Sequence, residues 1–184
     1  MPITAQAIYE QTLVIRSQIG DEAAFQELLR IYSPRLHSFA RKMLPADTAD
    51  RAEDLLQEIW VSIYRSLPTL LDVRKFRAWA FRIARDRIYT EFRRRKLIVE
   101  SLDEIDSDEL CEPEATSGNV DPEELHRCLS ALTSGHREVL LLRFFEDMNY
   151  DEIARVTGNS IGTVRSRIHY AKRALRRAVE NAIL

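Results

Sequence analysis

The segment between residues 74 and 96 combines many cations with interleaved aromatic rings. It holds ten basic residues against two acidic ones, and five aromatic residues lie among them. Arginine neutralises phosphate and a ring offers a flat face to an unstacked base, so this composition is typical of a site for single-stranded nucleic acid. Some rings must instead belong to the core, because Phe76, Trp79 and Ile83 share one helix face. The cations are Arg74, Lys75, Arg77, Arg82, Arg85, Arg87, Arg93, Arg94, Arg95 and Lys96, and the rings are Phe76, Trp79, Phe81, Tyr89 and Phe92.

A second candidate nucleic-acid site lies between residues 150 and 177. Ala154 is followed by Gly158 four residues later and by Val164 ten residues later. This spacing predicts a helix-turn-helix: the alanine lets two helices cross closely, the glycine takes a left-handed turn, and the valine fills the core between the helices. Ser160 is placed to cap the second helix.

The second of these helices has an apolar and a polar side. Five apolar residues are expected to face inward: Ile161, Val164, Ile168, Ala171 and Leu175. The residues expected to point outward are Ser166, His169, Arg173 and Arg177, flanked by Arg165 and Arg176. Donors near the start of a helix and cations along its flank are what reading duplex DNA requires. The alternative is a plain amphipathic helix whose arginines only keep the surface soluble.

A third candidate surface is acidic and lies on a helix expected between residues 49 and 67. Apolar residues cover one side of this helix: Leu55, Leu56, Ile59, Trp60, Ile63, Tyr64 and Leu67. Asp54, Gln57, Glu58 and Val61 share the opposite side. This stripe is either a docking surface for a basic partner protein or an ordinary solvated helix face.

The elements that must position these surfaces are helical. The 184 residues are 45% hydrophobic and 30% charged, with only five glycines and six prolines, and they lack the alternating β-branched pattern of a sheet protein. Apolar residues recur at intervals of three and four from Asp21 to about Lys96, with helix ends expected at Pro34 and Pro45, and again beyond Pro122. The predicted fold class is all-α, with two small helical domains.

The formal net charge of −2 hides a strong segregation of charge. Residues 97–124 hold eleven acidic residues and no basic one, whereas residues 155–184 hold seven basic residues and one acidic one. Residues 97–121 also lose the helical period, as expected of a flexible acidic linker. The predicted organisation is an N-terminal extension at 1–19, a helical domain at 20–96, the linker at 97–121 and a helix-turn-helix domain at 122–184.

Catalysis and secretion are both disfavoured. The sequence shows no paired general acid and base, no nucleophile triad and no phosphate-binding glycine loop, so no catalytic residue, metal or cofactor is predicted. Cys111 and Cys128, with His126 nearby, are expected to be inert thiols, with a redox or metal switch as the alternative. Two cysteines and the lack of a signal-peptide pattern favour a cytoplasmic protein without membrane insertion.

Four stretches resemble extracytoplasmic-function (group 4) sigma factors of the sigma-70 family. Residues 52–60 (AEDLLQEIW) resemble region 2.2, residues 76–85 (FRAWAFRIAR) resemble regions 2.3 to 2.4, and residues 150–154 (YDEIA) with 162–167 (GTVRSR) resemble region 4.2. The resemblance implies a dissociable subunit of bacterial RNA polymerase that directs initiation at promoters. It also implies a region 2-like bundle and a region 4-like helix-turn-helix, joined by the linker.

The resemblance further implies roles for individual residues. Asp54, Gln57 and Glu58 would bind core RNA polymerase. With the loop at 68–73, the first domain would recognise and melt the −10 element of promoter DNA through Arg74, Lys75, Trp79, Arg82, Arg85, Asp86, Arg93, Arg94 and Arg95. The second domain would read the −35 element as a duplex through Ser160, Thr163, Arg165, Ser166, His169 and Arg173. An anti-sigma factor is a further expected partner.

Two positions depart from the family pattern. Asp86 stands where asparagine is usual, and a carboxylate cannot donate a hydrogen bond and repels phosphate. Thr133 replaces a proline, and we expect it to cap a helix. Two other functions are left open by the sequence: a helix-turn-helix regulator that binds duplex DNA without polymerase, and a protein-interaction module that binds polymerase without DNA.

Overall fold

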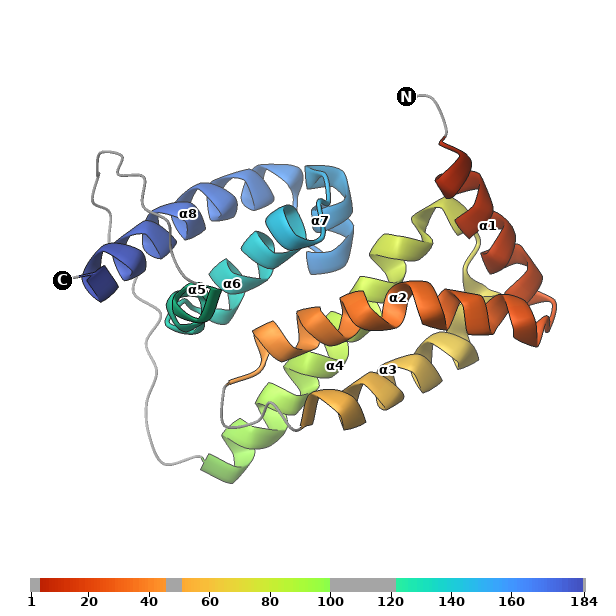
Figure 1. Cartoon of the computed structure of the whole chain (residues 1–184), viewed down its shortest axis with the longest axis horizontal. Coiled ribbons are helices and arrows are strands. Elements are labelled where there is room, and N and C mark those ends of the chain that lie inside the picture. Colours follow the sequence, from red (N-terminus) through yellow and green to blue (C-terminus); the bar gives the residue numbers. More distant parts are fainter. Residues whose placement is uncertain (1–3, 46–50, 100–121, 184) are drawn as a thin grey trace.

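The protein is helical throughout the residues that the structure describes, which confirms the predicted fold class. The structure is a computed structural model that describes residues 4–45, 51–99 and 122–183, and no strand occurs in these ranges. The N-terminal lobe holds α1 (Ala5–Gln18), α2 (Glu22–Met43), α3 (Arg51–Ser66), the short turns η2 (Leu67–Thr69) and η3 (Val73–Lys75), and α4 (Phe76–Val99). The C-terminal lobe holds α5 (Pro122–Ser130), α6 (Ser134–Leu140), the π-helical turn η4 (Leu141–Phe145), α7 (Tyr150–Thr157) and α8 (Ile161–Ile183). Figure 1 shows the two lobes side by side.

The core of the N-terminal lobe lies between α2, α3 and α4. Each of these helices buries large apolar side chains, among them Leu36, Ile59 and Phe81. The rings of Phe39 and Phe81 meet edge to face, with 5.4 Å between their centroids. One face of α4 is therefore fixed by packing, and its other faces are the ones available for function.

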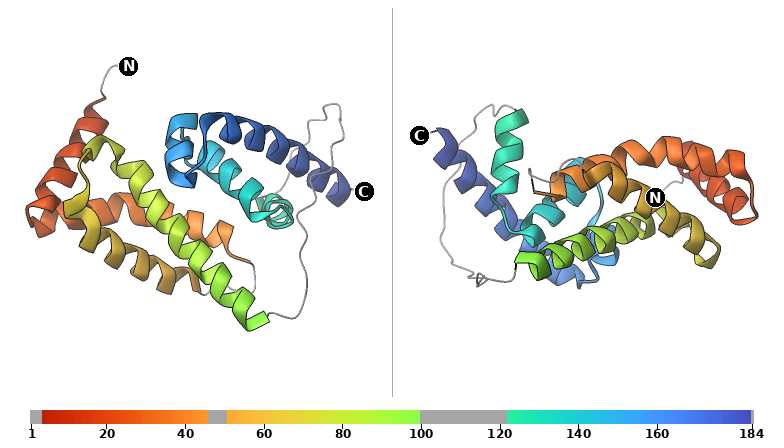
Figure 2. Two further views of the ribbon diagram at one scale, coloured as in Figure 1. Left: turned by 180° about the vertical axis from the view of Figure 1, so that it is seen from behind. Right: turned by 90° about the horizontal axis from the view of Figure 1, so that it is seen from below.

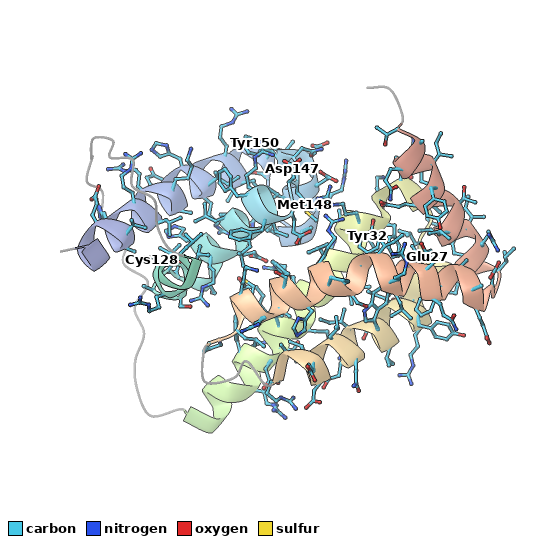
Figure 3. The ribbon with its side chains drawn as sticks, in the orientation of Figure 1. Glu27, Tyr32, Cys128, Asp147, Met148 and Tyr150 are labelled. Carbon is cyan, nitrogen blue, oxygen red and sulfur yellow. The ribbon has the colours of Figure 1, made fainter. Side chains whose placement is uncertain are left out.

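The expected N-terminal extension contains helix α1, which packs on α2. Leu13 and Val14 are buried, and the Tyr32 hydroxyl of α2 donates a 2.6 Å hydrogen bond to Glu10 of α1. Burial together with this bond to a carboxylate raises the pKa of Tyr32. Figure 3 shows Tyr32 on α2 in the part of the lobe next to α1. Residues 5–18 are thus an integral part of the packed lobe.

Pro34 does not end a helix, contrary to the prediction from the sequence. Helix α2 is continuous from Glu22 to Met43 with Pro34 inside it. The proline ring removes one backbone hydrogen bond, but Tyr32 and Leu36 on either side are buried, and their packing holds the helix together.

Helix α4 continues past its predicted end. It runs through Val99, so residues 97–99 of the expected linker are helical, and residues 100–121 lie outside the described residues. Although α4 is 24 residues long, neither it nor any other described helix has an apolar stretch that could cross a membrane.

The helix-turn-helix is present as α7 and α8. Gly158 ends α7 in a left-handed conformation with φ of 72°, and the Ser160 hydroxyl accepts a 3.1 Å hydrogen bond from the Thr163 backbone N–H at the start of α8. Val164 is buried between the helices. The turn, the cap and the central core residue therefore occupy the predicted positions. Thr133 also acts as predicted, because its hydroxyl caps α6.

Arg137 joins the C-terminal lobe to the end of α2. Its guanidinium is buried, and Nη1 donates a 2.8 Å hydrogen bond to the Met43 carbonyl. Nε and Nη2 donate to the carbonyls of Leu129, Ser130 and Leu132. Carbonyls in the last turn of a helix lack donors from their own helix. One arginine thus satisfies the ends of α2 and α5 together.

The two lobes pack against each other. Helix α7 lies on α4, and α5 and α6 lie on α2, as the two views of Figure 2 also show. Buried apolar residues of both lobes form one continuous core. The two domains that the sequence predicted are therefore joined by a shared interface.

The turn at Gly158 predicts a specific stability difference. Replacing Gly158 with alanine places a Cβ in the left-handed region, which costs about 1–2 kcal/mol per residue, and no neighbouring atom lies within 4 Å of that Cβ to add a clash. We expect the free energy of unfolding, measured by urea titration, to fall by this amount for Gly158→Ala. Gly162→Ala is the control, because its Cβ meets only the Ser160 hydroxyl at 3.7 Å; an equal loss in both variants would contradict the assignment.

Candidate nucleic-acid interface

One face of α4 presents cations to solvent. Arg82, Asp86 and Arg93 lie on this face and are exposed, and Trp79 on the same face is half-buried. Arg94 is exposed near the end of the helix, where it pairs with the buried Glu91 at 3.1 Å. Arg95 lies outside the described side chains. The exposed face of α4 therefore offers cations beside the edge of an indole ring.

The loop before α4 is held by charge pairs and by α1. Arg74 and Lys75 are exposed, and both pair with Asp72, at 2.8 Å and 3.2 Å. The hydrogen bonds from Arg74 lower the pKa of Asp72. The side-chain amide of Gln18 donates to the carbonyls that begin and end this turn, those of Leu67 and Leu70. The loop is thus anchored from a distant part of the sequence.

The aromatic residues of α4 divide between core and surface. Phe76 and Phe81 are buried, so these two rings serve the core. Trp79, Tyr89 and Phe92 are half-buried. Of the five rings, these three are the ones that keep some exposed area.

Arg85, predicted to contact DNA, is instead paired inside the protein. Its Nε donates a 2.6 Å hydrogen bond to Glu138 of α6, which has no exposed area. The Tyr89 hydroxyl donates to the other carboxylate oxygen at 3.2 Å, and the Arg85 guanidinium lies over the Tyr89 ring at 4.5 Å. Helix α4 therefore has a second flank that is covered by the C-terminal lobe.

Two more pairs of opposite charge bridge the lobes. Arg35 of α2 pairs with Glu146 at 2.8 Å, and that glutamate is buried. Arg77 of α4 approaches Glu152 of α7 at 3.8 Å. None of these pairs was predicted from the sequence, because each joins residues more than fifty positions apart and no local pattern signals such a contact.

Burial shifts the pKa of two carboxylates at the interface. It raises the pKa of Glu138, against the opposing attraction of Arg85, and raises the pKa of Glu146, against that of Arg35. Loss of hydration therefore outweighs ion pairing at these two groups.

The acidic stripe of α3 is exposed as predicted. Asp54, Gln57 and Glu58 are all at the surface beside the exposed Val61. Tyr64, assigned to the apolar side, is 61% exposed, and its ring meets that of Phe25 in a T-shaped contact with 5.1 Å between the centroids. The exposed tyrosine lies in the last two turns of α3, where the lobe no longer covers that side of the helix.

The exposed side of α8 carries most of its predicted DNA-contacting residues. Thr163, Arg165, Ser166 and His169 are exposed, and Ser160 is exposed at the cap. Three expectations for α8 differ from the structure.

The exceptions are Ile161, Arg173 and Arg177, and Arg177 is half-buried where it was expected to point outward. Ile161 was expected to face inward but is 44% exposed, because it precedes the first turn that packs on α7. Arg173 was expected to point outward but is half-buried, and its Nε and Nη2 are buried without a hydrogen-bond partner in the described part of the chain.

The cysteines give no sign of a metal centre among the described residues. Cys128 is buried on α5, in the C-terminal lobe, as Figure 3 shows. Cys111 and the side chain of His126 lie outside the described residues. No group of three histidine, cysteine or acidic side chains that could hold a metal ion occurs in the described part of the chain.

Comparisons with protein families and curated proteins identify both lobes. The family model for sigma-70 region 2 matches residues 28–98, and the model for sigma-70 region 4 matches residues 122–175. The ECF RNA polymerase sigma-E factor of Escherichia coli (strain K12) is 27% identical over 191 residues, covering 97% of this chain and 98% of that protein. The ECF RNA polymerase sigma factor EcfG of Rhodopseudomonas palustris (strain TIE-1) is 28% identical over 142 residues, or 77% of each chain.

Two solved structures share the arrangement of helices. The sigma factor RpoE of Bartonella quintana, in complex with the anti-sigma factor NepR, matches with a TM-score of 0.67 and 25% identity, covering 85% of this chain and 96% of that chain. CnrH, in complex with the cytosolic domain of CnrY, matches with a TM-score of 0.71 over 94% of this chain and 98% of that chain, and its 23% identity supports the fold alone.

The raised pKa of Glu146 predicts a pH-dependent contribution to stability. In the folded chain this carboxyl binds a proton at pH values where the unfolded chain, with an ordinary pKa of 4.5, has lost it. Its contribution to the free energy of unfolding is therefore greatest below that pH and is lost as the pH rises through the folded pKa. We expect the stability of the wild type relative to Glu146→Gln, from urea titrations at several pH values, to decline as the pH rises from about 4.5.

The adjacent Asp147 supplies the control. Its side chain is 97% exposed, so Asp147→Asn removes a carboxylate that is still hydrated in the folded chain. The decline in stability with rising pH that Glu146 causes in the wild type should therefore persist in this variant. A difference between the wild type and Glu146→Gln that does not change with pH would show that burial of Glu146 is not the cause.

Proposed function

Because this chain belongs to the sigma-70 family of RNA polymerase sigma factors, in its extracytoplasmic-function (ECF) group, we propose that its three exposed surfaces divide the recognition of polymerase and promoter DNA among them. The observation that carries the proposal is their placement: α4, α3 and α8 each present one polar face to solvent, on two lobes matched by two different sigma regions. Both lobes have a family match, which favours a sigma factor over a regulator that would use the helix-turn-helix alone.

The exposed face of α4 and the loop before it recognise and melt the −10 element. Separating DNA strands costs about 1.4 kcal/mol per base-pair step, and stacking on a protein ring recovers about 1–3 kcal/mol per base. Trp79 beside exposed cations suits that task, because the ring receives a base and the cations receive its phosphates. The residues proposed for this surface are Arg74, Lys75, Trp79, Arg82, Asp86, Arg93, Arg94 and Arg95. Arg85 is proposed with them, although it lies on the neighbouring flank and must leave Glu138 to take part.

The exposed side of α8 reads the −35 element as a duplex. The first two turns of the helix enter the major groove, where side-chain donors meet base edges and cations meet phosphates. The residues proposed for this surface are Ser160, Thr163, Arg165, Ser166, His169 and Arg173. The half-buried Arg173 must change rotamer to take part.

The acidic stripe of α3 docks on core RNA polymerase. Asp54, Gln57 and Glu58 are exposed, and Asp54 is linked to Arg94 of α4 through Arg51 and Glu91. The chain supplies specificity and no catalytic group, and it acts in the cytoplasm with its polymerase. An anti-sigma factor holds it inactive, as the complex of RpoE with NepR suggests.

Run-off transcription tests the proposed function. Core RNA polymerase is incubated with a promoter library, with and without this chain, and the products are sequenced. We expect transcripts that start downstream of a shared pair of elements only when the chain is present. No gain over core polymerase alone would reject the proposal, and tight sequence-specific duplex binding without polymerase would favour the independent regulator.

The stripe on α3 predicts a loss of polymerase binding without loss of fold. Asp54→Ala and Glu58→Ala each remove an exposed carboxylate, and surface substitutions of this kind change stability by about 0.5 kcal/mol or less. We expect weaker binding to core polymerase in a competition assay and unchanged circular dichroism. Glu22→Ala, an exposed acid on α2, is the control and should bind as the wild type does.

Arg165 predicts a loss of sequence discrimination at the −35 element. If it makes a bidentate contact with a base, Arg165→Ala should reduce discrimination between promoter variants by about 1–3 kcal/mol. Lys172, exposed on the flank of α8, serves as the comparison, because loss of a phosphate contact weakens binding to all sequences alike. Equal preference profiles for Arg165→Ala and Lys172→Ala would assign Arg165 to the phosphates instead.

A further inference from the structure

The turn that leads into α4 is held by α1, a helix for which the sequence predicted no function. The side-chain amide of Gln18, in the last turn of α1, donates hydrogen bonds to the carbonyls of Leu67, at 3.0 Å, and Leu70, at 2.8 Å. Figure 2 shows the connection between α3 and α4 next to α1. A residue outside both family matches therefore anchors the loop that we assign to the −10 element.

The same turn holds Leu71 in solvent. This residue is 99% exposed, more than any other large hydrophobic residue in the described part of the chain. Leu70 and Val73, on either side of it, pack against the core. The Asp72 carboxylate accepts a 3.2 Å hydrogen bond from the Arg74 backbone N–H. The backbone is therefore fixed on both sides of Leu71, while its side chain extends into solvent.

We propose that Gln18 is a positioning residue for promoter opening: its two hydrogen bonds fix the turn so that Leu71 enters between two bases of the −10 element as an apolar wedge. The role of Leu71 rests on the function proposed above. The anchoring of the turn by Gln18 does not depend on that function, and it can be tested without DNA or polymerase.

The surroundings of Leu71 suit a step between two bases. Proteins that bend or open DNA often insert an apolar side chain such as leucine between neighbouring bases, which unstacks them. Arg74 and Lys75 are exposed nearby, and their shared pairing with Asp72 leaves one positive charge in excess. The turn thus offers an apolar group for the bases and a cation for the adjoining phosphate. Trp79 on α4 is then placed to receive an unstacked base.

A wedge acts only if the backbone that carries it stays in place. A loop that is free to move shifts away from the bases and leaves them stacked, so the position of the inserted side chain must be set in advance. The Leu70 N–H donates to the Leu67 carbonyl at 3.1 Å, and this bond closes the turn. Gln18 then fixes the closed turn to α1, because one amide binds the carbonyls at both of its ends.

Hydrogen exchange tests the anchoring in the free, full-length chain. Gln18→Met keeps a side chain of similar length at a half-buried position and removes both donors. We expect the backbone amides of residues 70–75 to exchange at least about ten-fold faster in this variant, because the turn has lost two hydrogen bonds. The exchange rates of α2 and α3 should stay those of the wild type.

Gln6→Met is the matched control for this experiment. It makes the same change on the same helix, and the hydrogen bond that the Gln6 amide donates, to Glu10 at 2.9 Å, stays within α1. Residues 70–75 should exchange in this variant as they do in the wild type. Unchanged exchange of these residues in Gln18→Met would overturn the proposal, as would an equal acceleration in Gln6→Met or in α2 and α3.

Transcription from two forms of one promoter tests the wedge. Core RNA polymerase is combined with each variant, and the rate of transcript formation is measured on a promoter that the wild-type chain uses. One form is fully paired, and the other is pre-melted by mismatches across the −10 element. We expect Leu71→Ala to be about ten-fold slower on the paired form and within about two-fold of the wild type on the pre-melted form, because a wedge is needed only to unstack paired bases.

The control for Leu71→Ala is Ile19→Ala, which shortens another exposed apolar side chain, 81% exposed and next to Gln18 in the sequence. It should match the wild type on both forms of the promoter. A defect of Leu71→Ala that persists on the pre-melted form would show that Leu71 is not a wedge, and an equal defect in Ile19→Ala would show the same.

A double variant tests whether Gln18 acts through Leu71. Gln18→Met should slow transcription from the paired promoter about five-fold and leave the pre-melted form unaffected. Adding Gln18→Met to Leu71→Ala should cause no further loss, because the residue being positioned is already gone. Losses that multiply in the double variant would contradict the positioning role.

The inference and the proposed function fail separately. A wild-type chain that gives no promoter-specific transcripts would reject the function and the role of Leu71, whereas faster exchange in Gln18→Met would still establish the anchoring. Promoter-specific transcripts from the wild type, with unchanged exchange in Gln18→Met and unchanged rates in both variants, would keep the function and reject the inference.

Discussion

A helix binds DNA only through cations that its own protein has not already neutralised, and the arrangement of this molecule follows from how α4 meets that requirement. One face of α4 is buried against α2 and α3 through residues such as Ala84 and Ile88. On a second face, Arg85 forms an ion pair with the carboxylate of Glu138. The third face, with Arg82 and Arg93, remains in solvent. The 24 residues of α4 therefore divide among three roles: packing in the core, ion pairing within the protein, and exposure to solvent for recognition.

The interface between the lobes combines an apolar core with buried charge. The apolar part is continuous with the cores of both lobes and supplies attraction without direction. The charged part supplies direction, because Arg85 and Arg35 each require a carboxylate at one position. Burial raises the pKa of both glutamates that face them. The ion pairs therefore determine how the two lobes are aligned more than they add to the stability of the interface.

The sequence predicted what local chemistry decides. The left-handed turn at Gly158, the cap at Ser160 and the exposed stripe of α3 depend on residues within one or two helical turns, and each was found where expected. Pro34 was misjudged because burial on both sides of it overrides a local rule. The pairing of Arg85 with Glu138 was not predicted, because composition cannot distinguish a solvated arginine from one paired 53 residues away. The outward direction predicted for Arg173 was wrong for a related reason. A helical wheel gives the direction of a side chain on its own helix and contains no information about neighbouring elements.

Helix α1 has a consequence for how relatives of this chain are compared. The amide of Gln18 supports the carbonyls of Leu67 and Leu70, yet α1 ends before the region 2 match begins at residue 28. A chain shortened to that match would lose both bonds from Gln18, and the Leu67 carbonyl would keep only the bond from the Leu70 N–H. The conformation of that turn therefore depends on a helix that lies outside the region 2 match, so two sigma factors with identical turn sequences but different first helices can present different shapes to the same promoter.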